Sequence, residues 1–155
     1  MNAPCNVVVA VEPVDRIWYE LMPLLERHWA EIAHYKDIPL DINQRKYNGL
    51  HVLGVLRVFT ARLFGDIVGY AAYIVDHNLH YQGSLQALQD VVFLAPEHRR
   101  NGVGRLLLET ADAHLRAEGV QVVYHHVKHT HDFGPLLVSM GYTSIETIYG
   151  RRLDK

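Results

Sequence analysis

The stretch His98-Arg99-Arg100-Asn101-Gly102-Val103-Gly104-Arg105 stands between an apolar, strand-like run at residues 91–94 and a helix-like run that begins at residue 106. A strand that enters a short loop and then a helix leaves backbone N–H groups unpaired at the positive end of the helix dipole. Such a turn suits the oxygens of a phosphate group. The two glycines let an anion approach the backbone, and the three arginines add positive charge. The stretch therefore predicts an anion-binding loop.

Two common phosphate-binding motifs do not fit this loop. The dinucleotide fingerprint needs a third glycine where Leu107 stands, and the P-loop needs Lys followed by Ser or Thr where Arg105 and Leu106 stand. The pattern that fits is Arg-x-x-Gly-x-Gly over residues 99–104, with Pro96 just upstream. In this form the stretch resembles the pyrophosphate-binding motif of the GNAT superfamily of acyl-CoA-dependent N-acetyltransferases. The alternative is an ordinary strand-to-helix loop with a basic surface.

The composition is that of a globular protein with small partners. The chain has 155 residues, of which 49% are hydrophobic and 21% charged, so we expect one domain over residues 1–155. A net charge of −2 gives no general reason to expect binding to nucleic acid or to a membrane surface. The single Cys5 cannot form an internal disulfide, and the first residues lack the features of a signal peptide. We therefore expect a cytoplasmic protein.

Apolar patterns along the chain predict the order of helices and strands. Residues 15–32 have helical spacing, with Pro23 predicting a kink or a division into two helices. The polar stretch 34–49 is interpreted as a loop with one short helical turn. Further helices are expected at 103–118 and 133–140, and strands at 6–11, 52–61, 67–75, 85–94, 120–127 and, as a strand or hairpin, 142–153. The apolar run at 120–127 is typical of an interior strand.

This order predicts an α/β fold with a mixed sheet. The resemblance to the GNAT fold makes the expectation more specific: a single domain with a mixed, mostly antiparallel central sheet and helices on both faces. The most specific part of the resemblance lies between about residues 85 and 142. It implies acetyl-CoA as the cosubstrate and a strand, at 122–127, that splays away from its neighbour to make a slot for the pantetheine arm.

The resemblance also implies which residues bind acetyl-CoA. The strand before the loop would present its backbone at Phe93 and Leu94 to the pantetheine arm. The loop would bind the pyrophosphate through Arg99, Arg100, Asn101, Gly102, Val103, Gly104 and Arg105. Many family members also carry an Asn eleven residues before the glycine that ends the last helix. Counting back from Gly141, Thr130 stands there and is the last predicted cofactor-binding residue.

A second departure from the family concerns the general acid. Members often carry a Tyr four residues before that glycine, and it protonates the sulfur of coenzyme A. Leu137 stands at this place and cannot donate a proton. Either another group or the solvent must then protonate the thiolate. Alternatively, the domain binds coenzyme A and has lost catalysis.

Acetyl transfer to an amine needs a base to remove a proton and a donor, such as a backbone N–H near a strand bulge, for the developing oxyanion. Asp90 is the first candidate for the base, since it stands on the strand before the loop, where several family members place a carboxylate. The alternative is that Asp90 caps a turn or binds a neighbouring side chain. The acceptor is expected to be a primary amine of an unidentified small molecule or peptide, bound by the segments 12–50 and 77–84.

Eleven histidines are unusual for this length, and four of them cluster around the end of one predicted strand. Strand alternation would place His125, His129 and His131 on one face and His126 on the other. One or two could act in the acceptor pocket near neutral pH, and His126 is the second catalytic candidate. A histidine-rich metal-binding protein is an alternative, but no second set of ligands marks a metal site, so none is expected. Finally, a strand over 142–153 could pair with a second copy, which makes a homodimer a hypothesis.

Overall fold

Five strands form one sheet, in the order β1-β2-β3-β4-β5, in the computed structural model, which describes residues 6–155. The strands are β1 (Val7–Val11), β2 (Leu56–Leu63), β3 (Asp66–His77), β4 (Leu85–Leu94) and β5 (Val122–Tyr124). Strands β1 to β4 pair antiparallel with one another, and β5 is parallel to β4. The predicted mixed, mostly antiparallel sheet is therefore confirmed. Cys5 lies outside the described residues.

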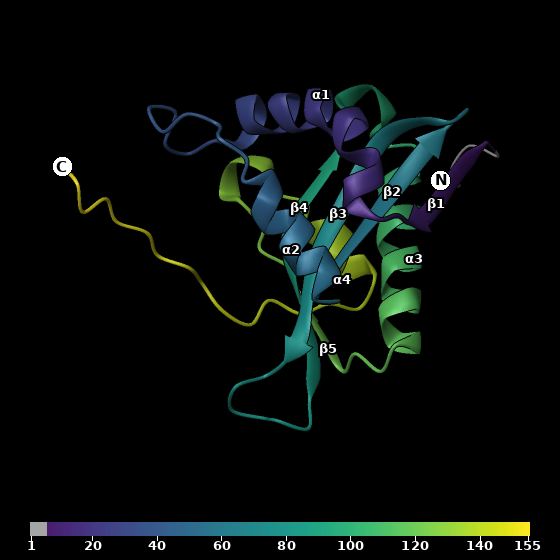
Figure 1. Ribbon diagram of the computed structural model, residues 1–155, viewed down its shortest axis with the longest axis vertical. Helices are drawn as coiled ribbons and strands as arrows, with labels where there is room; N and C mark the ends of the chain where they lie inside the picture. The colour runs from purple at the N-terminus through teal and green to yellow at the C-terminus, as the bar shows by residue number, and fades with distance from the viewer. Residues whose placement is uncertain (1–5) are drawn as a thin grey trace.

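Helices cover both faces of this sheet, as expected (Figure 1). On one face lie α1 (Val14–Ile32) and α2 (Gln44–Val52), and on the other α3 (Val103–Ala117) and the short α4 (Gly134–Ser139). Two short 3-10 helices, η1 (Pro96–His98) and η2 (His129–His131), lie in the connections. Each face has its own apolar core, because α1 and α3 each bury one apolar stripe against the strands.

Helix α1 is continuous although it contains Pro23. A proline inside a helix removes one backbone hydrogen bond and crowds the preceding turn. Figure 1 shows that the helix bends along its length, which is the usual response to an internal proline. Of the two outcomes predicted for this segment, the structure shows the kinked helix.

The stretch 34–49, interpreted as a loop with one short helical turn, contains most of a longer helix, α2, so that prediction was wrong for residues 44–49. Asn43 caps the helix, its side-chain oxygen accepting the backbone N–H of Lys46 at 2.9 Å. No residue of α2 is fully buried, so the helix has no strong apolar periodicity that the sequence could reveal. Because α2 extends to Val52, strand β2 begins only at Leu56 rather than at residue 52.

Strand β5 is much shorter than the predicted strand at 120–127 and lies at the edge of the described sheet, so the interior position was wrong. Its two valines point to opposite faces of the sheet. Val123 packs into the core beneath α3, whereas Val122 is 38% exposed. Residues 143–155 form neither strand nor helix, which corrects the strand predicted at 142–153. In the described residues no neighbouring strand pairs with this segment.

His125 is enclosed by the rings of Tyr73, Phe133 and Tyr142, and its Nδ1 lies 3.1 Å from Oε1 of Gln89. Burial lowers the pKa of His125 to about 4. The predicted grouping of histidines by strand alternation was wrong. The strand ends at Tyr124, and His129 and His131 belong to the 3-10 helix η2.

Acid should destabilise the fold through this histidine. In the unfolded state this histidine has a pKa near 6.5 and binds a proton below that pH. In the folded state it stays neutral until the pH falls to about 4. Stability is therefore retained above pH 6.5 and lost as the pH falls towards 4, by about 1–2 kcal/mol between pH 7 and 5 for one such group. Denaturant unfolding of His125→Gln should show a smaller loss over this range than the wild type. The control is His80→Gln, in the 78–84 loop, which should lose as much stability between these pH values as the wild type. If the unfolding free energy of all three proteins falls equally with pH, His125 is not the cause of the loss.

Candidate functional site

Strand β4 has a β partner on both sides only over its first residues. It pairs with β5 from Gln86↔Val122 to Leu88↔Tyr124, and then β5 ends while β4 continues to Leu94. Within residues 6–155, the second half of β4 therefore has no strand on that side, and its backbone groups there can bind a ligand. Phe93 and Leu94, the residues predicted to contact the pantetheine arm, lie in this half.

On its other side, the same half of β4 lies very close to β3. Gly69 pairs with Leu94, and a Cβ at position 69 would lie 2.8 Å from Leu94 Cδ1 and 2.9 Å from the carbonyl oxygen of Phe93. Only a hydrogen atom fits between the two strands at this point. The second half of β4 is thus open on the β5 side and closely packed on the β3 side.

Asp90 occupies a β-bulge in β4. The neighbouring pairs are Tyr73↔Gln89 and Ala72↔Val91, so Asp90 is an extra residue without a partner in β3. A bulge redirects a side chain, and here it turns Asp90 towards α2, where the hydroxyl of Tyr47 donates a hydrogen bond to its carboxylate. The bulge also breaks the regular backbone ladder at the point where β4 and β5 separate.

Tyr47 is a site residue that the sequence analysis missed, because its segment was interpreted as a loop. Burial raises the pKa of Tyr47, and the hydrogen bond to Asp90 raises it further, so the phenol keeps its proton. Its ring lies 6.0 Å from the ring of Trp18. The capping residue Asn43 is the one sequence signal that could have placed Tyr47 on a helix.

A second polar pair lies beside this one on the same face of the sheet. Nδ1 of His28, on α1, is 2.8 Å from the hydroxyl of Tyr70, and the His28 ring stacks on Phe93 with 4.8 Å between centroids. Burial lowers the pKa of His28 to about 4, so its imidazole is neutral at pH 7. The face of β4 that carries Asp90 is therefore lined by aromatic rings with a few polar groups.

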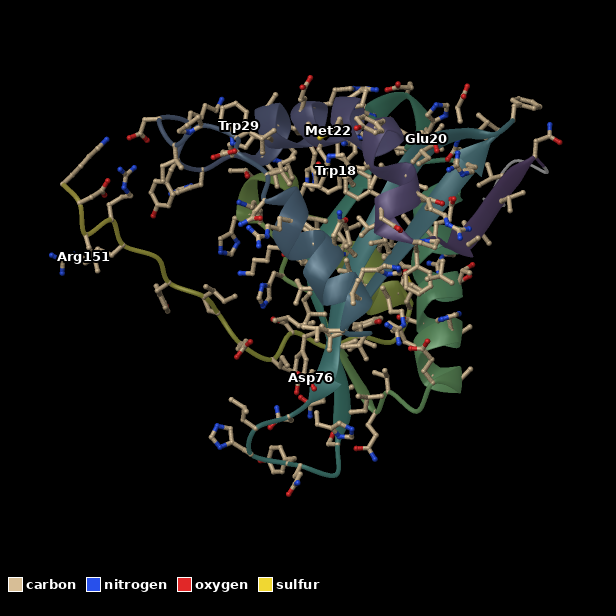
Figure 2. The ribbon with its side chains drawn as sticks, viewed as in Figure 1. Trp18, Glu20, Met22, Trp29, Asp76 and Arg151 are labelled. Atoms are coloured by element: carbon tan, nitrogen blue, oxygen red, sulfur yellow. The ribbon has the colours of Figure 1, made fainter. Side chains whose placement is uncertain are left out.

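A groove of about 330 Å³ opens between α1 and the start of α2. Figure 2 shows Trp18 and Met22 on the stretch of α1 that borders it. Leu40 and Ile42 complete an apolar wall, and Glu26 and Asp41 add carboxylates. Trp18 also lines the small apolar pocket that contains Tyr47, so the two spaces share one wall.

The predicted anion-binding loop joins β4 to α3. Gly102 has φ +86° and begins the helix, and Arg100, which is not a glycine, has φ +64°. A left-handed conformation at such a residue costs about 1–2 kcal/mol, so the loop holds Arg100 in a strained form. The side chain of Asn101 accepts the N–H of Val103 at 3.3 Å. Such strain is typical of a loop whose shape serves a ligand.

The three arginines of the loop have different surroundings. Arg99 bonds the carbonyl of Leu94 at 2.8 Å and the carboxylate of Glu31 at 2.7 Å, and its guanidinium lies over the Phe93 ring. Arg105 binds Glu109 at 3.1 Å and the hydroxyl of Ser139 at 2.6 Å. Among the described residues, no hydrogen bond or ion pair engages the side chain of Arg100. Arg100 is thus the arginine with its charge available.

Two arginine–glutamate pairs connect α1 to the loop region. Arg27 forms a two-pronged pair with Glu97 of η1, at 3.0 and 2.6 Å, and Arg99 forms the pair with Glu31. The hydrogen bond from Arg99 lowers the pKa of Glu31, so that carboxylate stays charged. The same helix that carries Trp18 and His28 therefore also fixes the position of the loop.

The remaining predicted residues lie apart from Asp90. Leu137 is buried in the core beneath α3 and does not reach the gap as a donor. Thr130 is exposed in η2, and its hydroxyl contacts Nδ1 of His131 at 3.2 Å. His126 is exposed just beyond β5. In the described part of the chain, no hydrogen bond connects Thr130 or His126 to Asp90 or to the loop.

No group of three or more His, Cys, Asp or Glu side chains in residues 6–155 is arranged to hold a metal ion. None of the helices described in the structure is long and apolar enough to cross a membrane.

Comparisons with known proteins give one clear family. A model of the acetyltransferase (GNAT) domain matches residues 55–144, whereas no curated protein matches the sequence. Among solved structures, a ribosomal-protein-alanine N-acetyltransferase from Brucella melitensis biovar Abortus 2308 superposes with a TM-score of 0.77 at 16% identity, covering 96% of this chain and 99% of that one.

Two further solved structures are similar. An aminoglycoside acetyltransferase from an uncultured soil metagenomic sample gives a TM-score of 0.76 at 16% identity over 97% of both chains. A predicted acetyltransferase with acetyl-CoA from Clostridium acetobutylicum gives 0.71 at 12% identity, over 95% of this chain and 96% of that one. Identities this low show a shared fold and do not identify the acceptor.

Proposed function

The chain belongs to the GNAT family of acetyltransferases, which use acetyl-CoA as cosubstrate, and from this premise we propose that it acetylates a primary amine of a small molecule or peptide. The observation that carries the proposal is Asp90, which a bulge places where β4 and β5 separate, in a hydrogen bond with Tyr47. A base at that point would lie between the acetyl-CoA and the acceptor amine, which the reaction must bring together.

The cofactor side fits the elongated shape of acetyl-CoA. The unpaired half of β4, with Phe93 and Leu94, would hold the pantetheine arm through its backbone. The loop would hold the pyrophosphate through the N–H groups of residues 100–102, 104 and 105, since the N–H of Val103 already bonds Asn101, and through the free charge of Arg100. In this proposal Arg99 does not bind phosphate directly. It fixes the position of the loop through its hydrogen bonds to Leu94 and to Glu31 of α1. Thr130 remains a prediction.

The chain's own groups supply the proton transfer. Bound acetyl-CoA would supply the acetyl group as an activated thioester. Asp90 removes the proton from the attacking amine, and Tyr47, which keeps its proton, holds the carboxylate in place. A backbone N–H at the bulge donates to the oxygen that gains charge. Because Leu137 has no proton to donate, the departing sulfur takes its proton from solvent.

The groove beside Trp18 supports a positively charged acceptor. Its apolar wall suits a carbon skeleton, and Glu26 and Asp41 favour an ammonium group. A coenzyme A-binding module without catalysis is the second candidate, and Leu137 favours it, since this residue has no proton to donate where the family often places its acid. A turnover assay that detects free thiol, run with amines, polyamines, aminoglycosides and peptides, distinguishes the two.

Replacing Asp90 by Asn should remove the base while keeping size and most hydrogen bonding. We expect kcat to fall roughly a hundredfold to ten-thousandfold, with acetyl-CoA affinity unchanged. Asp76→Asn, at the far end of β3, is the control and should leave both values unchanged. If Asp90→Asn keeps the wild-type kcat from about pH 6 to 9, the carboxylate is structural and His126 becomes the better candidate.

Removing the Tyr47 hydroxyl tests whether that group positions Asp90. Tyr47→Phe should lower kcat roughly tenfold, the effect of one hydrogen bond to a charged group, with little change in KM for acetyl-CoA. The chain offers a matched control outside the proposed site. There, the hydroxyl of Tyr142 donates a hydrogen bond of 2.6 Å to the carboxylate of Asp112. Tyr142→Phe should affect stability alone. A similar kcat loss in both variants would mean that the effect is structural.

Arg100 should lower the stability of the fold through its backbone strain and raise the affinity for acetyl-CoA through its charge. Arg100→Gly relieves the left-handed strain, so unfolding free energy should rise by about 0.5–1 kcal/mol, while acetyl-CoA affinity falls roughly tenfold. Arg100→Ala is the matched variant: it removes the same charge and keeps the strain, so only affinity should fall. Calorimetry and denaturant unfolding give the two values. Undiminished affinity in both variants would remove Arg100 from the phosphate site.

A further inference from the structure

The loop between α1 and α2, residues 33–43, forms part of the proposed acceptor groove. Leu40, Asp41 and Ile42 of this loop line the groove together with residues of α1. Ile42 packs against the apolar core, whereas Leu40 is 37% exposed and belongs to the outer part of the loop. The position of this outer part therefore determines how wide the groove is.

The outer part of the loop has few contacts of its own. Among the described residues, the backbone of residues 34–41 makes one hydrogen bond to another backbone group, from the N–H of Ile38 to the carbonyl of Tyr35 at 3.1 Å. The rings of His34 and Tyr35 pack edge to face with 4.6 Å between centroids, which is again a contact inside the loop. A loop with so few contacts opens readily unless another part of the chain holds it.

The C-terminal tail, residues 150–155, holds this loop from outside. Nη1 of Arg152 lies 3.1 Å from both carboxylate oxygens of Asp37, a residue 115 positions away in the sequence. The guanidinium carbon of Arg152 lies 5.4 Å from the centre of the Tyr35 ring. Nζ of Lys155 lies 2.5 Å from one oxygen of Asp37. The hydrogen bonds from Lys155 and Arg152 lower the pKa of Asp37, so its carboxylate is charged at neutral pH.

Arg152 is the more enclosed of the two cations. Its side chain is 21% exposed, whereas that of Lys155 is 64% exposed. Asp154 accepts hydrogen bonds from Nε, at 2.5 Å, and from Nη2 of the same guanidinium. All three nitrogens are therefore engaged, and the planar group is fixed over the ring of Tyr35. An isolated surface ion pair adds little stability, but a guanidinium that binds two carboxylates and an aromatic face is held in one geometry.

The neighbouring Arg151 has the same charge but no such contact. Figure 2 shows its side chain pointing away from the molecule. Within residues 6–155, no hydrogen bond or ion pair engages it. Loss of the Arg151 charge therefore changes the net charge of the tail as much as loss of Arg152 does, and leaves the contact with the loop intact. The two arginines form a matched pair for experiment.

We propose that Arg152 is a positioning residue for the acceptor, because its contacts with Asp37 and Tyr35 hold the loop 33–43 at the edge of the groove. This inference rests on the proposed function, which assigns the groove to the acceptor. In the described part of the chain, no hydrogen bond joins Arg152 to Asp90 or to the anion-binding loop. Its loss should therefore weaken acceptor binding and leave proton transfer and acetyl-CoA binding unchanged.

Cleavage of the full chain by a lysine-specific protease tests the contact without an acceptor. Lys36 is exposed in the loop beside Asp37, so the rate of cleavage after Lys36 reports how often the loop opens. Arg152→Gln should raise this rate roughly three- to tenfold, since it removes the ion pair and the ring contact but no cleavage site. Arg151→Gln should leave the rate unchanged. Equal rates in the wild type and both variants would overturn the proposal.

Kinetics with an acceptor found in the turnover assay separate positioning from chemistry. Arg152→Gln should raise KM for the acceptor roughly three- to tenfold, with kcat and KM for acetyl-CoA unchanged. Arg152→Lys should restore part of the affinity, because lysine keeps the charge but cannot form the planar contacts. Asp37→Asn should give a similar rise in KM, and combining it with Arg152→Gln should add little, since both changes remove the same contact.

The outcomes distinguish this inference from the proposed function. A wild-type protein that turns over no acceptor contradicts the proposed function, and the cleavage rates still decide whether Arg152 holds the loop. If an acceptor is turned over and its KM is unchanged in Arg152→Gln, or rises equally in Arg151→Gln, the role assigned to Arg152 is wrong. A fall in kcat alone would also overturn it, because a shift of the groove edge must appear in acceptor binding.

Discussion

Strand β4 is hydrogen-bonded to β3 along its length but to β5 only at its beginning, and the proposed chemistry depends on this asymmetry. A central strand normally has all its backbone groups paired. Here the chain leaves half of one strand open, places a bulge at Asp90 where the opening starts, and ends it with a loop of unpaired N–H groups. In the proposed reaction, a long thin ligand and a base meet along this one piece of backbone.

Helix α1 adds a second side to the proposed site along this open strand. It contacts the strand through His28, which stacks on Phe93, and it is tied to the loop region through Arg27 and Glu31. The same helix contributes Trp18 to the proposed acceptor groove. Because one rigid element carries contacts to both sides, the spacing between them is set by the helix rather than by flexible loops.

The sequence predicted the parts of the molecule that local rules determine. The Arg-x-x-Gly-x-Gly loop, strand β4 and the capped helix α3 follow from residues adjacent in the chain, and they were located correctly. Helix α2 was not, because it has no fully buried residue, and Tyr47 was lost with it.

The errors at β5 and beyond have another cause. Whether residues 120–127 and 142–153 form strands depends on which neighbour pairs with them, and pairing partners distant in the chain leave no mark on an apolar pattern. The bulge at Asp90 is similar, since it exists only as a shift of register against β3. Asp90 itself was selected for its position and its chemistry, and its contact with Tyr47 came only from the structure.

The close approach of β3 and β4 at Gly69 also extends the sequence pattern by which relatives of this protein can be found. Any side chain at that position would push against Leu94 and the backbone of Phe93 and separate the strands beside the loop. A chain that keeps the same geometry must therefore keep a glycine in β3 as well as Arg-x-x-Gly-x-Gly after β4. Requiring both together would make a search for distant relatives more selective than the short loop motif alone, because the added glycine reports on three-dimensional contact between two strands.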